Sequence, residues 1–496
     1  MVDIVIEKIS NSYIRIICGP SILRELSEQF TFDVPNAKFS PAFKRRVWDG
    51  KIRLLDSRKH TLFAGLASAV HQFASDNDYT IEDKTDLLIG EELSLAEAKS
   101  FVNTLNLPFV PRDYQLRAFA LAVRNKRSVL ISPTASGKSL IAYLITRYYN
   151  GKTLIVVPTV SLVMQMIKDF QQYGYDKEIH GVMAGVEKTT SNDITVSTWQ
   201  SVYEQNAEFF EDFDVVLGDE AHLFKAKSLI SIMTKMNNTE HRFGMTGTLD
   251  GAEVNSLVLQ GLFGQIEKVV HTSALISSGA LAELKIKILI LKHDKEASKS
   301  LVGKTYQDEL EYIISCQSRN RFIRNLALSL TGNTLLLYAY VDKHGRILHD
   351  MIKEKANHEN VFFVSGEVEA KVREDIRALV ETTNNSIIVA SYGVFSTGIN
   401  IRRLNNIIFA SPTKSRVRTL QSIGRGLRTD ENKEGCKLFD IADDLIHNKK
   451  NNYTMNHLIE RVTMYNMESF PYELHNIDIR SDKSDERNRN SLFKNV

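Results

Sequence analysis

The amino-acid sequence predicts an α/β protein in which two tandem, doubly wound domains follow a small α+β domain at the N-terminus. From about residue 112 onward, short apolar runs alternate with helical stretches, and a second such series begins near residue 333. Short, continuously apolar strands are typical of a parallel sheet that helices cover on both faces. Two consecutive series therefore indicate two parallel-sheet domains. The first hundred residues follow neither pattern and form a separate domain.

The expected strands are short and lie between turn residues or helical stretches. In the first series they are residues 128–132, 153–157, 194–197 and 214–218. In the second series they are residues 334–338, 361–364, 386–390, 406–410 and 437–440. We therefore divide the chain into an N-terminal domain (1–106), a first lobe (107–271), an inter-lobe connection (272–318), a second lobe (319–480) and a polar tail (481–496).

Composition and charge set a few limits on function. The chain has 496 residues and a net charge of only +2, so any nucleic-acid-binding surface must be a local basic patch. No apolar run approaches the roughly 20 residues that span a bilayer, and the N-terminus does not resemble a signal peptide, so we expect a cytoplasmic protein. Cys18, Cys316 and Cys436 lie far apart, which predicts three free, buried thiols and no zinc site.

The N-terminal domain contains a basic segment. Residues 2–6 and 13–17 alternate like strands, and residues 94–105 have a helical pattern. Residues 38–59 include eight Lys or Arg against two Asp, and Asp49-Gly50 predicts a hairpin turn. A nucleic-acid-binding role would use phosphate contacts and stacking of an aromatic ring on an unpaired base. The candidates are Lys44, Arg45, Arg46, Lys51, Arg53 and, for stacking, Trp48. The alternative is a solvated basic hairpin with the Trp in its core.

Residues 132–139, with the sequence SPTASGKS, follow an expected strand and open an expected helix. In that setting, backbone N–H groups and the helix N-terminus face the phosphates of a nucleotide. We expect Lys138 to contact the β- and γ-phosphates and the Ser139 hydroxyl to hold magnesium. The rest of the loop, expected to surround the phosphates, is Ser132 (in place of the usual first Gly), Pro133, Thr134, Ala135, Ser136 and Gly137. The alternative is a plain turn between a strand and a helix.

An acidic sequence, Asp219-Glu220-Ala221-His222, follows the expected strand at 214–218. The carboxyl end of a parallel strand is where α/β sheets bind ligands. We expect Asp219 to hold magnesium through water and Glu220 to orient or deprotonate an attacking water. The alternative is an acidic cap at the start of a helix.

The phosphate loop and the DEAH sequence together resemble superfamily-two helicases, and segments that resemble the other motifs of that class occur in the same order. Gln115, in the sequence RDYQ, resembles the adenine-reading position. Five further segments resemble motifs Ia, Ib, III, V and VI, and they are residues 158–159, 197–200, 246–248, 391–400 and 421–428, respectively. The resemblance implies two RecA-like lobes and an ATPase that uses ATP and magnesium.

The same resemblance implies roles for residues outside the phosphate loop. Thr159, Thr198 and Thr397 would bind the nucleic-acid backbone without reading its sequence. Arg425 and Arg428, three residues apart on one face of a helix, would reach the γ-phosphate across a cleft between the lobes. His222 and Gln421 would relay the nucleotide state between the lobes.

Four segments resemble the UvsW family of recombination helicases of T-even-like bacteriophages: residues 48–56, 303–307, 364–368 and the motif V segment. The similarity covers nearly the whole chain. This resemblance implies an ATP-dependent DNA helicase in the host cytoplasm. Its substrates would be single-stranded and branched DNA, including Holliday junctions, forks, D-loops and R-loops with their RNA–DNA hybrids, and it would also anneal strands. Recombination or replication proteins would be partners. Two alternatives remain: an RNA helicase or restriction motor, and a non-catalytic annealing or junction-binding protein that responds to ATP.

Overall fold

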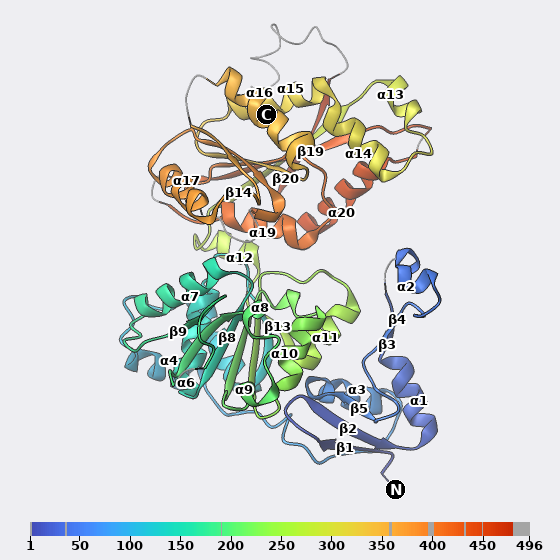
Figure 1. Cartoon of the computed structure of the whole chain (residues 1–496), viewed down its shortest axis with the longest axis vertical. Coiled ribbons are helices and arrows are strands. Elements are labelled where there is room, and N and C mark those ends of the chain that lie inside the picture. The colour runs from blue at the N-terminus through green and yellow to red at the C-terminus, as the bar shows by residue number, and fades with distance from the viewer. Residues whose placement is uncertain are drawn as a thin grey trace. The chain divides into compact units, whose positions relative to one another are not determined.

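The computed structural model describes residues 2–34, 37–189, 191–356, 360–394, 401–430, 433–448 and 450–479. The chain divides into two compact units, residues 1–132 with 137–270 and residues 133–136 with 271–496. The first unit contains the N-terminal domain and the first parallel sheet, here called lobe 1. The second contains the other parallel sheet, here called lobe 2 (Figure 1). The expected polar tail lies outside the described residues.

The N-terminal domain contains a four-stranded sheet with the order β5-β2-β1-β6. Its strands are β1 (Ile4–Lys8), β2 (Tyr13–Cys18), β5 (Thr61–Phe63) and β6 (Ile81–Asp83). β1 pairs antiparallel with β2 and parallel with β6. Ile4, Ile6, Ile14 and Ile16 are buried because alternate side chains of each strand face the same side. Helices α1 (Pro20–Gln29) and α3 (Ala67–Asp76), with the short turn η2 (Ala64–Leu66), complete the predicted α+β domain.

A projection of the N-terminal domain, here called the arm, comprises residues 31–53. β3 (Thr31–Asp33) pairs antiparallel with β4 (Lys51–Arg53), and η1 (Ala37–Phe39) and α2 (Pro41–Lys44) lie between them (Figure 1). The predicted two-residue hairpin at Asp49-Gly50 is therefore wrong. The Asp49 carboxylate accepts a hydrogen bond from the Lys51 amide at 3.2 Å, so these residues make a local turn before β4 instead of joining two paired strands.

Lobe 1 is a seven-stranded parallel sheet with the order β13-β7-β12-β11-β8-β10-β9. Its strands are β7 (Arg127–Ile131), β8 (Thr153–Val157), β9 (His180–Val182), β10 (Ile194–Thr198), β11 (Val215–Asp219), β12 (His241–Thr246) and β13 (Gln265–Lys268). The four predicted strands are confirmed, with ends that differ by at most one residue. β9, β12 and β13 were not predicted. The sequence of β12 includes a fully buried arginine, Arg242, which breaks the apolar pattern of a central strand.

Helices cover both faces of the lobe 1 sheet (Figure 1). Leu130 and Ile155 face the cluster that includes α5, α6 and α7, whereas Val129 and Leu154 face the cluster that includes α10 and α11. The helical elements of this region are α4 (Leu95–Thr104), α5 (Asp113–Asn125), α6 (Lys138–Tyr149), α7 (Val160–Gln172), α8 (Trp199–Val202), α9 (Ala207–Glu211), η3 (Ala221–Leu223), α10 (Lys227–Lys235) and α11 (Glu253–Phe263). The predicted helix at 94–105 is α4, which begins with a capping box formed by Ser94 and Glu97.

The N-terminal domain docks on the amino-terminal edge of the lobe 1 sheet. Arg242 of β12 is fully buried and donates to Ser12 Oγ at 2.9 Å, and Arg127 of β7 donates to the Asn11 carbonyl at 2.7 Å. An added Cβ on Gly65 would lie 2.1 Å from the Gln260 carbonyl oxygen, so the two backbones approach closely. One hydrophobic cluster also runs from this domain into lobe 1. The domain therefore attaches to the edge opposite the carboxyl ends of the strands.

Lobe 2 is a second seven-stranded parallel sheet, with the order β16-β17-β15-β18-β19-β14-β20. Its strands are β14 (Glu283–Lys292), β15 (Thr334–Tyr338), β16 (Val361–Val364), β17 (Ile387–Ser391), β18 (Asn406–Phe409), β19 (Gly435–Asp444) and β20 (Tyr472–Asp478). All five predicted strands are present. The expected inter-lobe connection differs from the structure, because its residues 283–292 form β14, which pairs along its length with β19.

The helical elements of the second unit precede, connect or follow these strands (Figure 1). They are α12 (Thr272–Ser277), α13 (Lys295–Ser300), α14 (Tyr306–Ser315), α15 (Gln317–Ser329), η4 (Val341–Arg346), α16 (Ile347–Lys355), α17 (Ala370–Thr382), α19 (Arg416–Gly426) and α20 (Tyr453–Met467). α15 and α16 pack on one face of the sheet through Phe322, Ile323 and Ile352. The predicted fold class, two parallel-sheet domains after an α+β domain, is confirmed.

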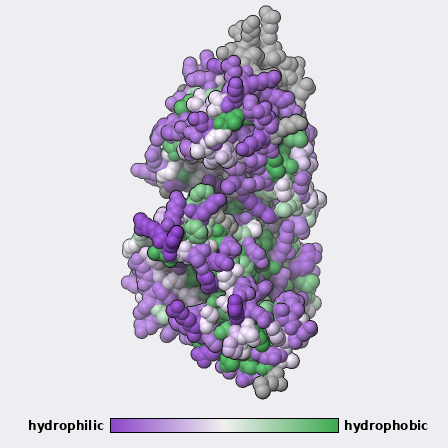
Figure 2. Space-filling model, turned by 90° about the vertical axis from the view of Figure 1, so that its right-hand side faces the viewer, coloured by the Kyte–Doolittle hydropathy of each residue, from purple (hydrophilic) through white to green (hydrophobic). Residues whose placement is uncertain are grey.

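The surface and the cysteines complete the comparison with the sequence. Hydrophilic side chains predominate on the face shown in Figure 2, with apolar ones scattered among them. None of the described helices is long and apolar enough to cross a membrane. The three thiols are free, as predicted, but only Cys436 is buried. Cys18 and Cys316 are partly exposed, so the expectation of three buried thiols is wrong for these two.

Candidate functional site

The phosphate loop, the DEAH sequence and the Thr246-Gly247-Thr248 segment meet at the carboxyl edge of the lobe 1 sheet. β12 lies between β7 and β11, so its last residue borders both. Thr246 is in register with Ile131 of β7, Met245 is in register with Asp219 of β11, and the Ser132 amide donates to the Thr246 carbonyl at 2.9 Å. Three motifs that are far apart in the sequence therefore become neighbours.

The phosphate loop turns tightly into α6. Ala135 and Gly137 have φ values of 66° and 80°, in the left-handed region, and Lys138 begins the helix. The Lys138 ammonium donates to the Ser132 carbonyl at 3.3 Å. An added Cβ on Gly137 would lie 2.4 Å from Gln115 Nε2. Glycine is required here for its backbone conformation and for the space beside Gln115.

Gln115 lies beside the phosphate loop although it precedes the loop in the sequence by an entire helix and strand. It occupies the third position of α5, is buried, and accepts a hydrogen bond from the Arg112 amide at 2.9 Å. This contact fixes the side chain at the start of the helix. The carboxamide of Gln115 therefore lies next to Gly137 of the phosphate loop.

The two carboxylates of the DEAH sequence lie where β11 ends. Asp219 is the last residue of that strand, and Glu220 follows with a φ of 49°. Burial and the neighbouring Glu220 raise the pKa of Asp219 to about 6, while Lys138 acts in the opposite direction. An environment that disfavours a bare carboxylate anion is one that a bound cation would relieve.

His222 joins the DEAH sequence to the next strand. Its Nδ1 lies 3.0 Å from Thr246 Oγ1 and 3.3 Å from Glu220 Oε2. Thr246 Oγ1 also donates to the Thr248 carbonyl at 3.0 Å. The His222 imidazole therefore links the Glu220 carboxylate to the threonine at the end of β12.

Ser139 has a partner that the sequence did not predict. Its Oγ lies 2.9 Å from the hydroxyl oxygen of Tyr173, the residue that follows α7. Tyr173 also packs edge-on against Phe109 and Tyr143. No motif marks Tyr173, and only its aromatic character could have drawn attention to it. If the Ser139 hydroxyl donates to Tyr173, its oxygen lone pairs remain free to bind magnesium.

The threonines expected to bind a nucleic-acid backbone follow adjacent strands of lobe 1. Thr159 follows β8 and caps α7, accepting from the Leu162 amide at 3.4 Å. Thr198 ends β10, is buried, and its Oγ1 lies 2.9 Å from Ser201 Oγ. Thr159 is the more accessible of the two. Thr397 lies outside the described residues.

The candidate arginines of the second unit lie at the end of α19. Gln421 and Arg425 are within the helix, which Ser415 caps by accepting from the Arg418 amide at 3.3 Å. Arg428 does not share this helix, because α19 ends at Gly426. The predicted arrangement of two arginines on one helical face is therefore wrong. Lys433 fixes the segment after the helix by donating to the Arg428 carbonyl at 2.9 Å.

The basic residues predicted to contact nucleic acid are all in the arm, but they are not equivalent. Arg53 pairs with Asp49 at 2.5 Å, and Lys51 lies 4.0 Å from Asp33. The Trp48 indole donates to the Lys51 carbonyl at 2.8 Å and is partly exposed. The adjacent cations Lys44, Arg45 and Arg46 are exposed on the surface of the arm. These three are the better candidates for phosphate contacts.

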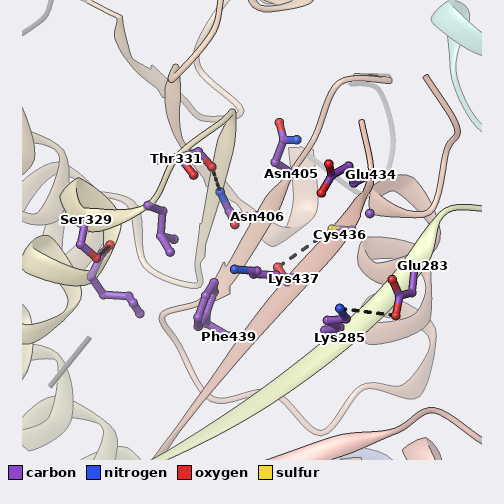
Figure 3. Close-up of a pocket in the computed structure, with 13 residues that line it drawn as sticks. Glu283, Lys285, Ser329, Thr331, Asn405, Asn406, Glu434, Cys436, Lys437 and Phe439 are labelled. Atoms are coloured by element: carbon purple, nitrogen blue, oxygen red, sulfur yellow. Dashed lines mark hydrogen bonds and ion pairs between the residues drawn. The ribbon is translucent and has the colours of Figure 1, made fainter. Parts of the chain in front are cut away.

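A pocket of about 530 Å³ lies at the amino-terminal edge of the lobe 2 sheet. Glu283, Lys285, Asn406, Cys436 and Lys437 are among its lining residues, and most of those labelled in Figure 3 are polar. Ligands of α/β sheets bind at the opposite, carboxyl edge. The pocket lies at the edge where such sheets do not usually bind ligands, and its lining residue Cys436 neighbours Gly426 at the end of α19.

Three parts of the chain match known families. Residues 3–83 match "DNA helicase UvsW, N-terminal", residues 108–251 match "Type III restriction enzyme, res subunit", and residues 317–430 match "Helicase conserved C-terminal domain". Together with two parallel sheets and the converging phosphate-loop and DEAH motifs, these matches define a superfamily-two helicase with two RecA-like lobes.

The particular family follows from whole-chain similarity. The ATP-dependent DNA helicase uvsW of Enterobacteria phage T4 is 35% identical over 496 residues, with 94% of this chain and 98% of the relative covered. The crystal structure of T4 UvsW is 33% identical, has a TM-score of 0.52, and covers 96% of this chain and 100% of its own. The chain belongs to the UvsW family of ATP-dependent DNA helicases.

More distant relatives share only part of the chain. The DNA 3'-5' translocase XPB2 of Sulfurisphaera tokodaii is 28% identical over 45% of this chain and 51% of its own. The DNA-bound Type ISP restriction-modification enzyme LlaBIII is 18% identical, has a TM-score of 0.56, and covers 77% of this chain and 32% of its own. The second similarity shows the fold alone.

Proposed function

We propose that this protein couples ATP hydrolysis to unwinding and branch migration of branched DNA in phage recombination and replication, in the cytoplasm of the host cell. Its substrates would be Holliday junctions, stalled forks, D-loops and R-loops, and it would also anneal single strands. The observation that carries the proposal is the convergence of Lys138, Asp219, Glu220 and the His222–Thr246 contact at one edge of lobe 1. Family membership supplies the DNA substrate.

Each residue of the ATP site has a distinct proposed role. Lys138 and the backbone amides of the phosphate loop bind the phosphates, and Gln115 contacts the adenine. Glu220 orients or deprotonates the attacking water. Arg425 and Arg428 stabilise charge on the γ-phosphate, and His222 and Gln421 relay the nucleotide state. Because phosphoryl transfer is accelerated mainly by positioning and charge stabilisation, these roles are enough for an ATPase.

Magnesium would be bound by Ser139 and, through water, by Asp219. Mg²⁺ prefers oxygen ligands, retains several waters and takes one or two protein ligands together with substrate phosphates. The raised pKa of Asp219 supports this assignment, because a cation at that position would favour the ionised carboxylate. When bound, the ion neutralises charge that develops on the phosphates.

Backbone contacts in lobe 1 and in the arm would bind DNA. Thr159, Thr198 and Thr397 are the motif-based contacts to the phosphate backbone. Lys44, Arg45, Arg46, Lys51 and Arg53 would add phosphate contacts from the arm, and Trp48 would stack on an unpaired base. The docking of the N-terminal domain on lobe 1 through Arg242 and Arg127 supports a joint role, because these contacts tie both parts into one unit.

The test is steady-state ATP hydrolysis measured together with strand separation on matched single-stranded DNA, duplex DNA, four-way junction and RNA–DNA hybrid. We expect branched DNA to give the strongest stimulation of hydrolysis and measurable unwinding. ATP turnover without strand separation on any substrate would favour a translocase or remodelling factor. Annealing without any DNA-stimulated turnover would favour a non-catalytic junction-binding protein. Preference for RNA alone would indicate an RNA helicase.

A further inference from the structure

Tyr173, which belongs to no helicase motif identified above, places its hydroxyl beside the phosphate loop. It follows α7 directly, and its amide donates to the Asp169 carbonyl at 3.0 Å where that helix ends. The Tyr173 hydroxyl oxygen lies 2.9 Å from Oγ of Ser139, the second residue of α6. The contact is partly buried, so water screens it less than it would an exposed hydrogen bond. Tyr173 therefore contacts the side chain that is proposed to hold magnesium.

Aromatic packing fixes the position of the Tyr173 ring. Its centroid lies 5.5 Å from the ring of Phe109 and 5.5 Å from that of Tyr143, and both contacts are edge-on. Tyr143 is fully buried and also packs edge-on against Phe170 at 5.2 Å. Edge-on contacts are a favourable arrangement for aromatic rings. Because two neighbours hold the Tyr173 ring, its hydroxyl has a defined place relative to α6.

Tyr143 offers a comparison within the same aromatic cluster. Ser139 and Tyr143 stand four residues apart on α6 and so share one face of that helix. The Tyr143 hydroxyl accepts a hydrogen bond from Arg147 Nη1 at 2.8 Å. Tyr143 therefore packs in the same cluster as Tyr173 but directs its hydroxyl to a different side chain.

The direction of the Ser139 proton decides what else the Ser139 oxygen can bind. A serine hydroxyl has one proton and two acceptor lone pairs. Donation to Tyr173 leaves both lone pairs available to a cation, whereas acceptance from Tyr173 uses one of them. A positive charge near the oxygen favours donation, because it repels the hydroxyl proton. Without a fixed acceptor, a serine hydroxyl can instead turn toward nearby backbone groups.

We propose that Tyr173 is a positioning residue for the magnesium site: it accepts the Ser139 hydroxyl proton and so keeps the lone pairs of Ser139 Oγ available to the metal. This inference rests on the proposed function, in which Ser139 binds magnesium together with the phosphates of ATP. Tyr173 acts through Ser139 and contacts neither the metal nor the nucleotide. Its hydroxyl should therefore matter for the metal-dependent part of nucleotide binding and not for the rest.

The test is the affinity of the full-length protein for a non-hydrolysable ATP analogue, measured by isothermal titration calorimetry in excess EDTA and over a range of free Mg²⁺. The ratio of the two affinities isolates the coupling between metal and nucleotide. Tyr173→Phe keeps the ring and removes the hydroxyl. We expect it to reduce the Mg²⁺-dependent gain in affinity by roughly fivefold to tenfold, the size of one hydrogen bond. The affinity in EDTA should stay unchanged.

Tyr143→Phe is the matched control, because it removes the same atom from a neighbouring ring of the cluster. We expect it to keep the wild-type gain in affinity. No loss in Tyr173→Phe, or an equal loss in both variants, would show that Tyr173 contributes only packing and would overturn the proposal. A loss that is as large in EDTA as in Mg²⁺ would also overturn it, because Tyr173 would then act on the nucleotide itself. If Tyr173→Phe does not fold, Tyr173→Met, whose flexible apolar side chain fills the space, has the same expected result.

Ser139→Ala separates failure of this inference from failure of the proposed function. It should remove most of the Mg²⁺-dependent gain, and adding Tyr173→Phe should then change nothing further, because the tyrosine acts only through the serine. A full additional loss in the double variant contradicts the positioning role and leaves the proposed site intact. If the wild-type protein shows no Mg²⁺-dependent gain, or Ser139→Ala retains it, the proposed magnesium site is wrong and the role of Tyr173 falls with it.

Discussion

Lobes 1 and 2 are the same kind of parallel sheet, but their carboxyl edges carry different chemistry. At the edge of lobe 1, Asp219, Glu220 and His222 come from one short stretch and are partly exposed. At the edge of lobe 2, His293, Arg319 and Asp443 come from three distant stretches and are buried around one another. This difference is the one expected if the lobe 1 groups meet a ligand and therefore stay accessible, whereas the lobe 2 groups bind one another and are buried in the core.

A second buried network in lobe 2 makes the contrast stronger. Asp440 and Arg461 are both buried and pair twice, each time at 2.8 Å. The Tyr465 hydroxyl donates to Asp440 at 2.9 Å, and Arg461 also donates to the Thr413 carbonyl at 2.6 Å. These bonds join α20 to β19 and to the segment before α19. We interpret this network as structural, because its members bind one another and not a ligand.

The largest expected effect in the comparison is on catalysis at lobe 1. Lys138→Ala removes the ammonium that would stabilise the β- and γ-phosphates, so we expect a loss of at least about 10³-fold in ATP turnover, with unwinding lost in parallel. The measurement is steady-state phosphate release with and without branched DNA. The melting temperature should change little, because the hydrogen bond that the Lys138 ammonium donates to the Ser132 carbonyl is long, at 3.3 Å. ATP turnover at the wild-type rate would refute the site assignment.

The next largest effect is on stability at lobe 2. Arg461→Met leaves the Asp440 carboxylate buried without its cation, which should cost about 3–5 kcal/mol in the free energy of unfolding. Thermal unfolding, with hydrogen exchange of α20 and β19 to localise the change, measures it. The control is Arg346→Met, which breaks the exposed pairs with Asp342 and Glu367 and should cost far less, because solvent screens exposed charges. Equal losses in both variants would show that burial does not set the cost.

The contrast between contiguous motifs and groups from distant stretches explains which features the sequence could predict. Apolar runs located nine of the lobe strands, and contiguous motifs located the phosphate loop and the DEAH sequence. β12 was missed because Arg242 interrupts its apolar pattern, although hydrogen bonds to Ser12, Met233 and Thr239 satisfy it in the structure. Tertiary partners of this kind leave no local signal in the sequence.

The missed features of the candidate site have the same origin. The Ser139–Tyr173 contact and the position of Gln115 beside Gly137 depend on how α5, α6 and α7 pack, which no spacing rule encodes. The end of α19 at Gly426, which separates Arg425 from Arg428, was missed because spacing alone does not fix where a helix stops. The arm was taken for a hairpin because Asp49-Gly50 turns locally in both arrangements.

A smaller effect should appear where the lobe 1 edge transmits a signal. Thr246→Val keeps the volume of the side chain but removes the oxygen that His222 Nδ1 approaches at 3.0 Å. If this contact relays the state of Glu220, we expect the number of base pairs unwound per ATP hydrolysed to fall by roughly tenfold. That factor corresponds to the loss of one or two hydrogen bonds of about 1 kcal/mol each. Parallel losses of hydrolysis and unwinding would indicate a role in catalysis instead. Ser256→Ala is a control on α11, where the hydroxyl donates only to the Ala252 carbonyl.

The smallest expected effect concerns the arm. The double substitution Lys44→Gln with Arg45→Gln removes two exposed cations and leaves the Asp49–Arg53 pair intact. Because phosphate contacts release counterions, each lost contact should reduce the slope of log affinity against log salt by about 0.9 for duplex DNA. Binding to a four-way junction, measured by fluorescence anisotropy over a range of salt concentrations, should therefore weaken with a slope lower by up to about 1.8.

The matched control for the arm is Arg24→Gln, in an exposed pair with Glu28 on α1 of the same domain. It changes the net charge of the N-terminal domain without touching the arm. If it lowers the salt slope as much per charge as the double substitution does, the domain attracts DNA only through its overall charge. If only the arm variant changes the slope, the cations of the arm contact phosphates directly. The affinity deficit of that variant relative to the wild-type protein should then be largest at low salt and shrink as salt rises, because the lost contacts are salt-dependent ones.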